Sequence, residues 1–221
     1  MMQAGPFKML SLMEHDGIGL LKLSQPPTNR MSRLFFEEFS NLVDSLKENN
    51  PFRALIISGS GRHFSQGADL DDLLKAIEEE GMKESTSFFN ENRKSFQKLH
   101  TLDMPVIAAI QGVCLGSALE LALFCDFRIC AQGALLALPE TNFFLIPGCG
   151  GTQRLQQLVK RNKALELMLE GKNVSAEEAL EWGLVDKICP KKDLLDAALT
   201  FAKTINADFN RDQRDHYLKS L

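Results

Sequence analysis

Two glutamates that could transfer protons lie in apolar segments, twenty positions apart in the sequence. Glu120 belongs to the run GSALELALF at residues 116–124, and Glu140 follows LLALP at residues 135–139. An ionised carboxylate is costly to bury without partners, so a buried one is normally paired, protonated or functional. Two of them in apolar settings predict an acid–base pair with shifted pKa values. Two structural interpretations stay open: Glu120 paired with a nearby Arg or Lys, and Glu140 capping a helix.

The composition is that of an ordinary globular protein. Of 221 residues, 44% are hydrophobic and 24% are charged, which is enough for one sizeable domain. The formal net charge of -4 argues against nucleic acid as a partner. We expect one catalytic domain over residues 1–205 and a short polar C-terminal tail over residues 206–221.

The remaining reactive residue types indicate neither a metal site nor a catalytic triad. The five cysteines form no CxxC pair and no zinc spacing, which predicts reduced thiols. His63 and His100 lack the partners of a triad or a ligand cluster, and we expect Asp126 to be structural. The N-terminus shows no secretory or transit pattern, and the apolar stretches are too short to span a bilayer. These features predict a cytoplasmic protein without a membrane partner.

The elements that must position the glutamates follow from periodicity and turn residues. Alternation broken at His15-Asp16-Gly17 predicts a hairpin over residues 8–23. Short apolar runs predict buried strands over residues 54–58, 105–110, 127–131 and 185–188. Apolar residues at helical spacing predict helices over residues 32–48, 70–101 (with a break near Gly81), 117–124, from about 152, 175–182 and 191–206. Glycines predict turns over residues 112–116 and 148–151. This alternation of strands and helices predicts an α/β domain with βαβ crossovers.

Several segments resemble the crotonase (enoyl-CoA hydratase/isomerase) superfamily, in order and spacing, over residues 8–205. They are FSQGADL (64–70), GVCLGSALELALFCD (112–126), Pro139-Glu140, IPGCGGTQRL (146–155) and AEEALEWGLV (176–185). The resemblance implies an α/β crotonase-type (ClpP/crotonase) spiral of ββα units with surrounding helices. Full-length relatives usually continue with further helices, so it also implies a shortened C-terminal helical region here.

The resemblance implies chemistry on acyl-CoA thioesters through an enolate, whose oxygen gains negative charge. By that resemblance, the backbone N–H groups of Ala68 and Ser117 form the oxyanion hole that stabilises this charge. Ser117 stands where the family usually has glycine, yet a serine can still donate its N–H. Because Ser117 would open the predicted helix over residues 117–124, the helix dipole would add positive potential at the oxyanion.

The resemblance also assigns roles to the two glutamates. In relatives that hydrate a double bond, two glutamates hold one water; Glu140 matches the α-carbon proton donor and Glu120 its partner in activating water. Gly148 matches the glycine whose backbone helps to place that water. Retention of Glu120 favours an enoyl-CoA hydratase. The alternatives are an enoyl-CoA isomerase that uses Glu140 alone and a non-catalytic acyl-CoA-binding member of the family.

Further expectations concern the substrate and its partners. The resemblance implies substrate or CoA contacts at Arg62, Gly67, Asp69, Leu70 and Gly116, with Arg30 and Arg33 as additional basic candidates for the phosphates. It implies no metal and no separate cofactor, because coenzyme A enters as part of the thioester, and it implies a homotrimer or a dimer of trimers. Phe143-Phe144 stand where the family often has a smaller residue; they would reshape the acyl pocket or pack into the core.

Overall fold

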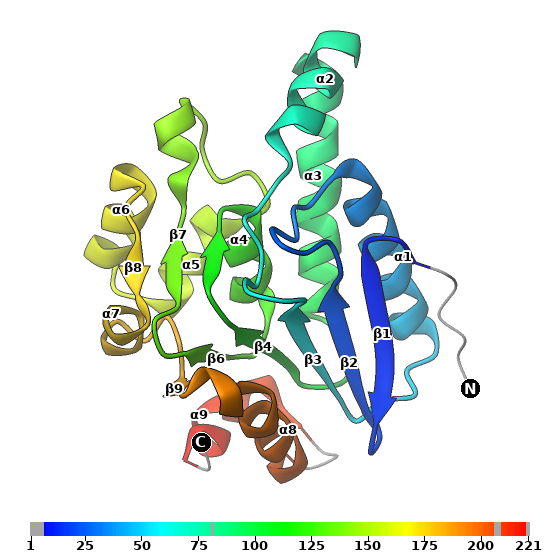
Figure 1. Ribbon diagram of the computed structural model, residues 1–221, viewed down its shortest axis with the longest axis vertical. Coiled ribbons are helices and arrows are strands. Elements are labelled where there is room, and N and C mark those ends of the chain that lie inside the picture. Colours follow the sequence, from blue (N-terminus) through cyan, green and yellow to red (C-terminus); the bar gives the residue numbers. More distant parts are fainter. Residues whose placement is uncertain (1–6, 81, 206–208, 220–221) are drawn as a thin grey trace.

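The computed structural model describes residues 7–80, 82–205 and 209–219, and its strands form two sheets (Figure 1). The larger sheet has six strands in the order β1-β2-β3-β4-β6-β9, and the smaller has three in the order β5-β7-β8. The strands of the larger sheet are β1 (Leu10–His15), β2 (Ile18–Leu23), β3 (Ala54–Gly59), β4 (Val106–Ile110), β6 (Phe127–Ala131) and β9 (Lys187–Cys189). Those of the smaller sheet are β5 (Val113–Leu115), β7 (Leu135–Ala137) and β8 (Val174–Ser175).

Helices connect and cover these strands. The α-helices are α1 (Arg33–Glu48), α2 (Leu70–Glu80), α3 (Met82–Leu99), α4 (Ser117–Phe124), α5 (Gly151–Leu158), α6 (Arg161–Glu170), α7 (Ala176–Glu181), α8 (Leu194–Thr204) and α9 (Arg214–Leu218). The 3₁₀ turns are η1 (Pro139–Phe143), η2 (Lys191–Asp193) and η3 (Arg211–Gln213). No helix among the described residues is long and apolar enough to cross a membrane.

The larger sheet is parallel except at its first hairpin. β1 pairs antiparallel with β2, and the pairs β2–β3, β3–β4, β4–β6 and β6–β9 are all parallel. Parallel neighbours require crossover connections, which here carry the helices. The predicted hairpin, α/β class and crossovers are therefore confirmed.

Both faces of the larger sheet are buried. On β3, Leu55 and Ile57 face the core that includes α1 and α3, whereas Ala54 and Ile56 face the core that includes α8. Figure 1 shows α8 and α1 on opposite sides of this sheet. Burial on two sides explains why its strands read as continuous apolar runs rather than as alternating ones.

Several elements differ from the sequence-based expectation. The predicted turn over residues 112–116 contains the strand β5, and the strands β7 and β8 and the helix α6 were not predicted. β5 and β7 have three residues each and are stabilised by pairing with each other, which no local pattern reveals. The final helix begins with η2 before α8, and the expected break near Gly81 lies outside the described residues.

The described part of the C-terminal segment, residues 209–219, packs against the larger sheet. The ring of Phe209 lies 6.0 Å from that of Phe127 on β6, and Tyr217 is buried. Arg211 forms an ion pair with the buried Asp126, with 2.7 Å between Nε and Oδ1. These contacts join the segment to the core beneath α8.

Candidate active site

A cavity of about 640 Å³ brings together most of the predicted site residues. Eight of them line it: Gly67, Ala68, Leu70, Gly116, Ser117, Glu120, Glu140 and Gly148. The other lining residues are Arg30, Gln66, Asn90, Leu115, Pro139, Asn142, Phe143, Leu145 and Ile146. Arg62 and Asp69 are not among the described residues that line this cavity.

The first candidate oxyanion donor, Ala68, lies in an extended loop after β3. Its neighbours are bonded to Met31: the Met31 N–H donates to Gly67 O at 2.9 Å, and the Asp69 N–H donates to Met31 O at 3.0 Å. In such a parallel bridge the intervening Ala68 N–H points away from Met31. This arrangement leaves the Ala68 N–H available to a ligand in the cavity.

Gly67 allows this loop to approach the segment that carries the second donor. Its φ is +86°, and a Cβ there would lie 2.5 Å from the carbonyl oxygen of Leu115 and 3.5 Å from the Ser117 nitrogen. Any side chain would therefore push the two loops apart. The close approach brings the backbone around Ala68 next to the start of α4.

Ser117 is the first residue of α4, and its N–H has no intrahelical acceptor because of that position. Glu120 N–H donates to Gly116 O at 2.9 Å and closes the first turn. All eight residues of α4 are buried, so its N-terminal N–H groups act away from bulk water. A negatively charged oxygen near Ala68 and Ser117 would be stabilised by these donors and by the helix dipole.

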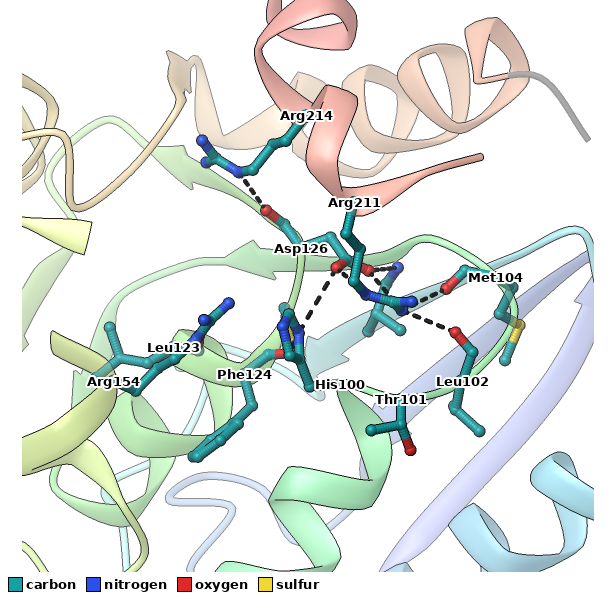
Figure 2. A network of polar contacts seen from close by, with 12 residues as sticks. His100, Thr101, Leu102, Met104, Leu123, Phe124, Asp126, Arg154, Arg211 and Arg214 are labelled. Carbon is teal, nitrogen blue, oxygen red and sulfur yellow. Dashed lines mark hydrogen bonds and ion pairs between the residues drawn. The ribbon is translucent and has the colours of Figure 1, made fainter. Parts of the chain in front are cut away.

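The backbone carbonyl groups at the C-terminal end of α4 accept hydrogen bonds from side chains of other elements. Arg154 Nε donates to Leu123 O at 2.9 Å, and Arg128 donates to Cys125 O at 2.8 Å. His100 Nδ1 lies 3.2 Å from Phe124 O, as drawn in Figure 2. Because these donors come from α5, β6 and the residue directly after α3, they hold α4 in one position relative to its neighbours.

Glu120 is fully buried and bonded to the loop before α5. Its Oε1 accepts hydrogen bonds from the Cys149 N–H at 2.9 Å and the Gly151 N–H at 2.7 Å. Burial, followed by the charge of Glu140, raises the pKa of Glu120 to about 8, although the two N–H donors oppose the shift. Among the described residues no Arg or Lys forms an ion pair with Glu120. The interpretation of Glu120 as a residue paired with a nearby Arg or Lys is therefore wrong.

Glu140 lies in η1, and its Oε1 is 3.0 Å from the position of a Cβ on Gly116. Its Oε2 is buried and has no hydrogen-bond partner among the described residues. Burial raises the pKa of Glu140 to about 7, against a lowering by its own backbone N–H. Such a carboxyl group can hold a proton near neutral pH and give it to a ligand.

The two carboxyl groups therefore form a pair suited to proton transfer. Both line one cavity, and both have a pKa raised toward neutrality. A pair of this kind can hold one proton between two sites, so that one member acts as an acid while the other acts as a base. Gly148 lines the same cavity directly before Cys149, whose N–H holds Glu120.

Some of the charged residues predicted to contact the substrate lie at the cavity, and others lie away from it. Arg30 lines the cavity, with its Nη1 at 4.0 Å from Asp69 Oδ1 and 3.9 Å from Asp71 Oδ2. Asp69 also accepts a hydrogen bond from the Asp71 N–H at 3.2 Å and thus caps α2. Arg62 lies in an exposed turn, where its carbonyl oxygen is 3.5 Å from Lys191 Nζ. Of the basic candidates Arg30, Arg33 and Arg62, only Arg30 is among the described residues that line the cavity.

Sequence reasoning left the position of Phe143-Phe144 open, and they do not pack into the core. Phe143 lines the cavity with 54% of its surface exposed, and Phe144 is fully exposed. Leu145 and Ile146, which line the cavity too, were not predicted. The one feature of the sequence that could have indicated these two residues is the run of four apolar residues, 143–146, shortly after Glu140.

The two histidines and Asp126 have structural partners. His63 Nδ1 accepts a hydrogen bond from the Val113 N–H at 3.1 Å, and burial lowers the pKa of His63. Burial and nearby arginines lower the pKa of His100 to about 4. Figure 2 shows His100 and Arg211 on either side of Asp126. In the part of the chain that the structure describes, no three His, Cys, Asp or Glu side chains could hold a metal.

The sequence and the fold are similar to those of known proteins. The family model described as enoyl-CoA hydratase/isomerase matches residues 13–215. A Bacillus subtilis (strain 168) protein named probable enoyl-CoA hydratase is 39% identical over 176 residues, covering 80% of this chain and 67% of that protein. Fatty acid oxidation complex subunit alpha of Shewanella amazonensis is 38% identical over 192 residues, 85% of this chain and 27% of that protein. The crystal structure of enoyl-CoA hydratase from Bacillus anthracis has a TM-score of 0.82 at 34% identity, over 89% of this chain and 76% of that chain.

Proposed function

Because the chain belongs to the enoyl-CoA hydratase/isomerase family and has its α/β crotonase fold, we propose that it is an enoyl-CoA hydratase. The reaction is syn addition of water to a 2-enoyl-CoA thioester, which gives a 3-hydroxyacyl-CoA. The observation that carries the proposal is the pair Glu120 and Glu140, two carboxyl groups of raised pKa in one cavity. The backbone donors at Ala68 and Ser117 line the same cavity.

In the proposed reaction the thioester oxygen accepts hydrogen bonds from the Ala68 and Ser117 N–H groups. The carboxyl pair holds one proton, and in the reactive form that proton is on Glu140 and Glu120 is ionised. With the higher pKa, about 8 against about 7, Glu120 is the stronger base of the pair. It takes a proton from water as the water oxygen bonds to the β-carbon. The electron pair of the double bond moves toward the carbonyl and gives the enolate. Protonated Glu140 then gives its proton to the α-carbon, and the carbonyl reforms. At the end Glu120 holds the proton taken from water and Glu140 is ionised, so the carboxyl pair still holds one proton.

Substitution of Glu140 by Gln tests this function. We expect turnover of crotonyl-CoA to fall by about 10²–10⁴-fold because the α-carbon loses its proton donor, while the fold persists. Steady-state kinetics measure the loss, and circular dichroism checks the fold. The matched control is Glu178→Gln, the same substitution at an exposed carboxyl group in the first turn of α7. Near-normal turnover by the Glu140→Gln enzyme would refute the proposal.

An isomerase that uses Glu140 alone is the second candidate. It is favoured by the Oε2 of Glu140, which is buried with no hydrogen-bond partner among the described residues and could carry a proton between two substrate carbons. Glu120→Gln separates the two reactions, because a hydratase needs Glu120 to activate water. Loss of hydration in Glu120→Gln supports the hydratase; retained double-bond migration with no hydration in either protein supports the isomerase.

The remaining expectations belong to this proposal. CoA's phosphates would lie near Arg30, with Arg62 as the further basic residue, and no cofactor beyond the thioester is needed. A homotrimer or dimer of trimers follows from the family resemblance, and light scattering measures it directly. A cytoplasmic location and a role in acyl-CoA metabolism stay predictions.

A further inference from the structure

A second cavity, of about 210 Å³, lies between the larger sheet and the start of α8. Among the described residues, it shares no lining residue with the cavity that Glu120 and Glu140 line. Its polar lining side chains are those of Lys22, Ser58, Gln111, Lys191 and Lys192. We refer to it as the lysine cavity.

The larger sheet places polar residues where the rows of side chains that face α8 come to an end. On β2, Lys22 follows Leu20 by two positions, and Leu20 belongs to the core that includes α8. On β3, Ser58 follows Ile56 of the same core by two positions. Residues two apart on a strand face the same side, and Lys22 is in register with Ser58. The lysine cavity therefore lies at the carboxyl ends of parallel strands, where α/β sheets commonly bind ligands.

Gln111, directly after β4, contributes a buried acceptor to this cavity. The residue is only 7% exposed, and its Nε2 donates to Gly59 O at 2.6 Å. Its Oε1 is buried and has no hydrogen-bond partner among the described residues. A buried acceptor without a partner is costly and uncommon in native proteins. A ligand with a hydrogen-bond donor in the lysine cavity would satisfy it.

The charged residues that line the cavity are all positive. Lys22 comes from β2, and Lys191 and Lys192 come from η2. No Asp or Glu is among the described residues that line it, and Asp193, which ends η2, is not a lining residue. Lys191 Nζ lies 3.5 Å from the carbonyl oxygen of Arg62, which carries no neutralising charge. Three ammonium groups around one cavity repel one another, and a shared anion would relieve this repulsion.

Hydrogen bonds hold the turn that forms one wall of the lysine cavity. The Ser60 N–H donates to Leu23 O at 2.9 Å, and Asn29 Nδ2 donates to Ser60 O at 2.9 Å. A Cβ on Gly59 would lie 2.1 Å from His63 O, so this turn folds closely back onto the end of β3. Because the wall is already ordered, a ligand does not have to pay for ordering it.

We propose that the lysine cavity is a second ligand site, which binds the phosphate monoester of a small polyol. The phosphate lies among the three lysines, and a hydroxyl group of the polyol donates to Gln111 Oε1. Three cations suit a phosphate monoester, with its charge of nearly -2, better than a carboxylate with a charge of -1. The volume of about 210 Å³ equals that of about seven water molecules, which is room for a phosphate group and a few carbons.

Calorimetry with glycerol 3-phosphate tests the role of the lysines. It is done in low salt at about pH 7.5, where the phosphate is close to a dianion. Lys22→Gln and Lys192→Gln should each raise Kd by about tenfold, because each removes a hydrogen bond to a charged group. The matched control is Lys47→Gln, an exposed lysine in the last turn of α1 that does not line the cavity. The control should bind as the wild type does.

The role of Gln111 is tested with a ligand that lacks hydroxyl groups. Propyl phosphate has the same number of carbons as glycerol 3-phosphate, and the wild type should bind it about tenfold more weakly. Gln111→Met removes the acceptor at similar size, so it should bind the two phosphates with similar Kd. Thermal unfolding checks the fold of this variant, and the lysine variants test the site if Gln111→Met does not fold.

Binding is measured directly, so the result does not depend on the proposed hydratase activity. Absence of binding at millimolar glycerol 3-phosphate overturns the proposal, as does equal weakening in Lys47→Gln and the cavity variants. Glycerate bound as tightly as glycerol 3-phosphate overturns the assignment to a phosphate monoester. Unchanged affinity in the presence of saturating CoA supports a separate site, whereas displacement by CoA assigns the lysine cavity to the active site and overturns it.

Discussion

At the scale of single residues, Glu120 links function to stability. Its carboxyl group is buried with a pKa raised to about 8 from an ordinary 4.5, with burial as the main cause. The folded chain therefore binds this proton more tightly than the unfolded chain does. The associated stability is fully present below pH 4.5 and is lost as the pH rises through about 8.

Glu120→Gln should remove this pH dependence. Gln keeps the carbonyl oxygen that accepts from Cys149 and Gly151 but has no proton to lose. We expect the free energy of unfolding of the variant to exceed that of the wild type at pH 8.5, by on the order of a few kcal/mol, and to approach it at pH 5. Urea unfolding at both values measures the difference.

The control for this prediction is Glu178→Gln in the capping box of α7, an exposed carboxyl group whose pKa is lowered by hydrogen bonds to Ser175. Because the pKa of Glu178 is lowered from 4.5, the group is ionised at both pH 5 and pH 8.5, so that variant should be less stable than the wild type by a similar amount at the two values. Equal free energies of unfolding for Glu120→Gln and wild type at pH 8.5 would contradict a raised pKa at Glu120.

At the scale of elements, the contact between α4 and α5 places the carboxyl group of Glu120. Gly151 begins α5, and its N–H is one of the two donors to Glu120. A Cβ on Gly151 would lie 2.9 Å from both Cγ and Oε1 of Glu120. Because the group in conflict is a side chain, Glu120 has to move while both helices can stay in place.

Gly151→Ala should therefore displace Glu120. A displacement of about 1 Å in a catalytic group can cost about 10²-fold, so we expect kcat for hydration to fall by about that factor. KM should change little because the oxyanion donors are on other residues. Thr152→Ala, in the same helical turn, is the matched control for kinetics and for thermal stability. If Gly151→Ala hydrates crotonyl-CoA at the wild-type rate, Glu120 is not the group that activates water.

At the scale of the whole molecule, the segment after α8 completes the environment of a buried charge at the far end of α4. Arg211 donates to Asp126 and, through Nη2, to Leu102 O at 2.8 Å and Met104 O at 3.1 Å (Figure 2). Asp126 also accepts from the Val106 N–H at 2.8 Å. Burial raises the pKa of Asp126, and Arg211 opposes that shift.

Arg211→Ala should destabilise the protein by about 2 kcal/mol at pH 7. That is less than the 3–5 kcal/mol typical of breaking a fully buried pair, because the Arg211 side chain is 27% exposed. The loss should shrink at acidic pH, where Asp126 takes up a proton and needs no partner. Urea unfolding at pH 7 and pH 4 measures both effects.

Arg211→Lys is the control, since it retains the charge near Asp126 but cannot reach both carbonyl groups in the same planar geometry. We expect it to lose less stability than Arg211→Ala. An Arg211→Ala protein as stable as the wild type at pH 7 would show that the C-terminal segment does not stabilise Asp126.

The sequence alone determined the elements whose signals are local. The hairpin at His15-Asp16-Gly17 is present as predicted. The helices predicted from residues 32 and 175 begin at local caps, which are Ser32 and the capping box of Ser175 with Glu178. Each depends on hydrogen bonds between residues within a few positions, so no contact with a distant segment is needed to favour it. The identities of Glu120 and Glu140 as a candidate acid–base pair also required only their apolar neighbours.

Tertiary structure determined the burial, the hydrogen-bond donors and therefore the pKa values of those carboxyl groups. The donors to Glu120 lie about thirty positions away, and the strand β5 forms through its pairing with β7 and its hydrogen bonds to Ser65. The same distant packing placed Arg30 at the cavity and Arg62 outside it. A pKa shift, a cavity and a short strand all arise from burial by residues remote in sequence, which no local pattern of residue types can specify.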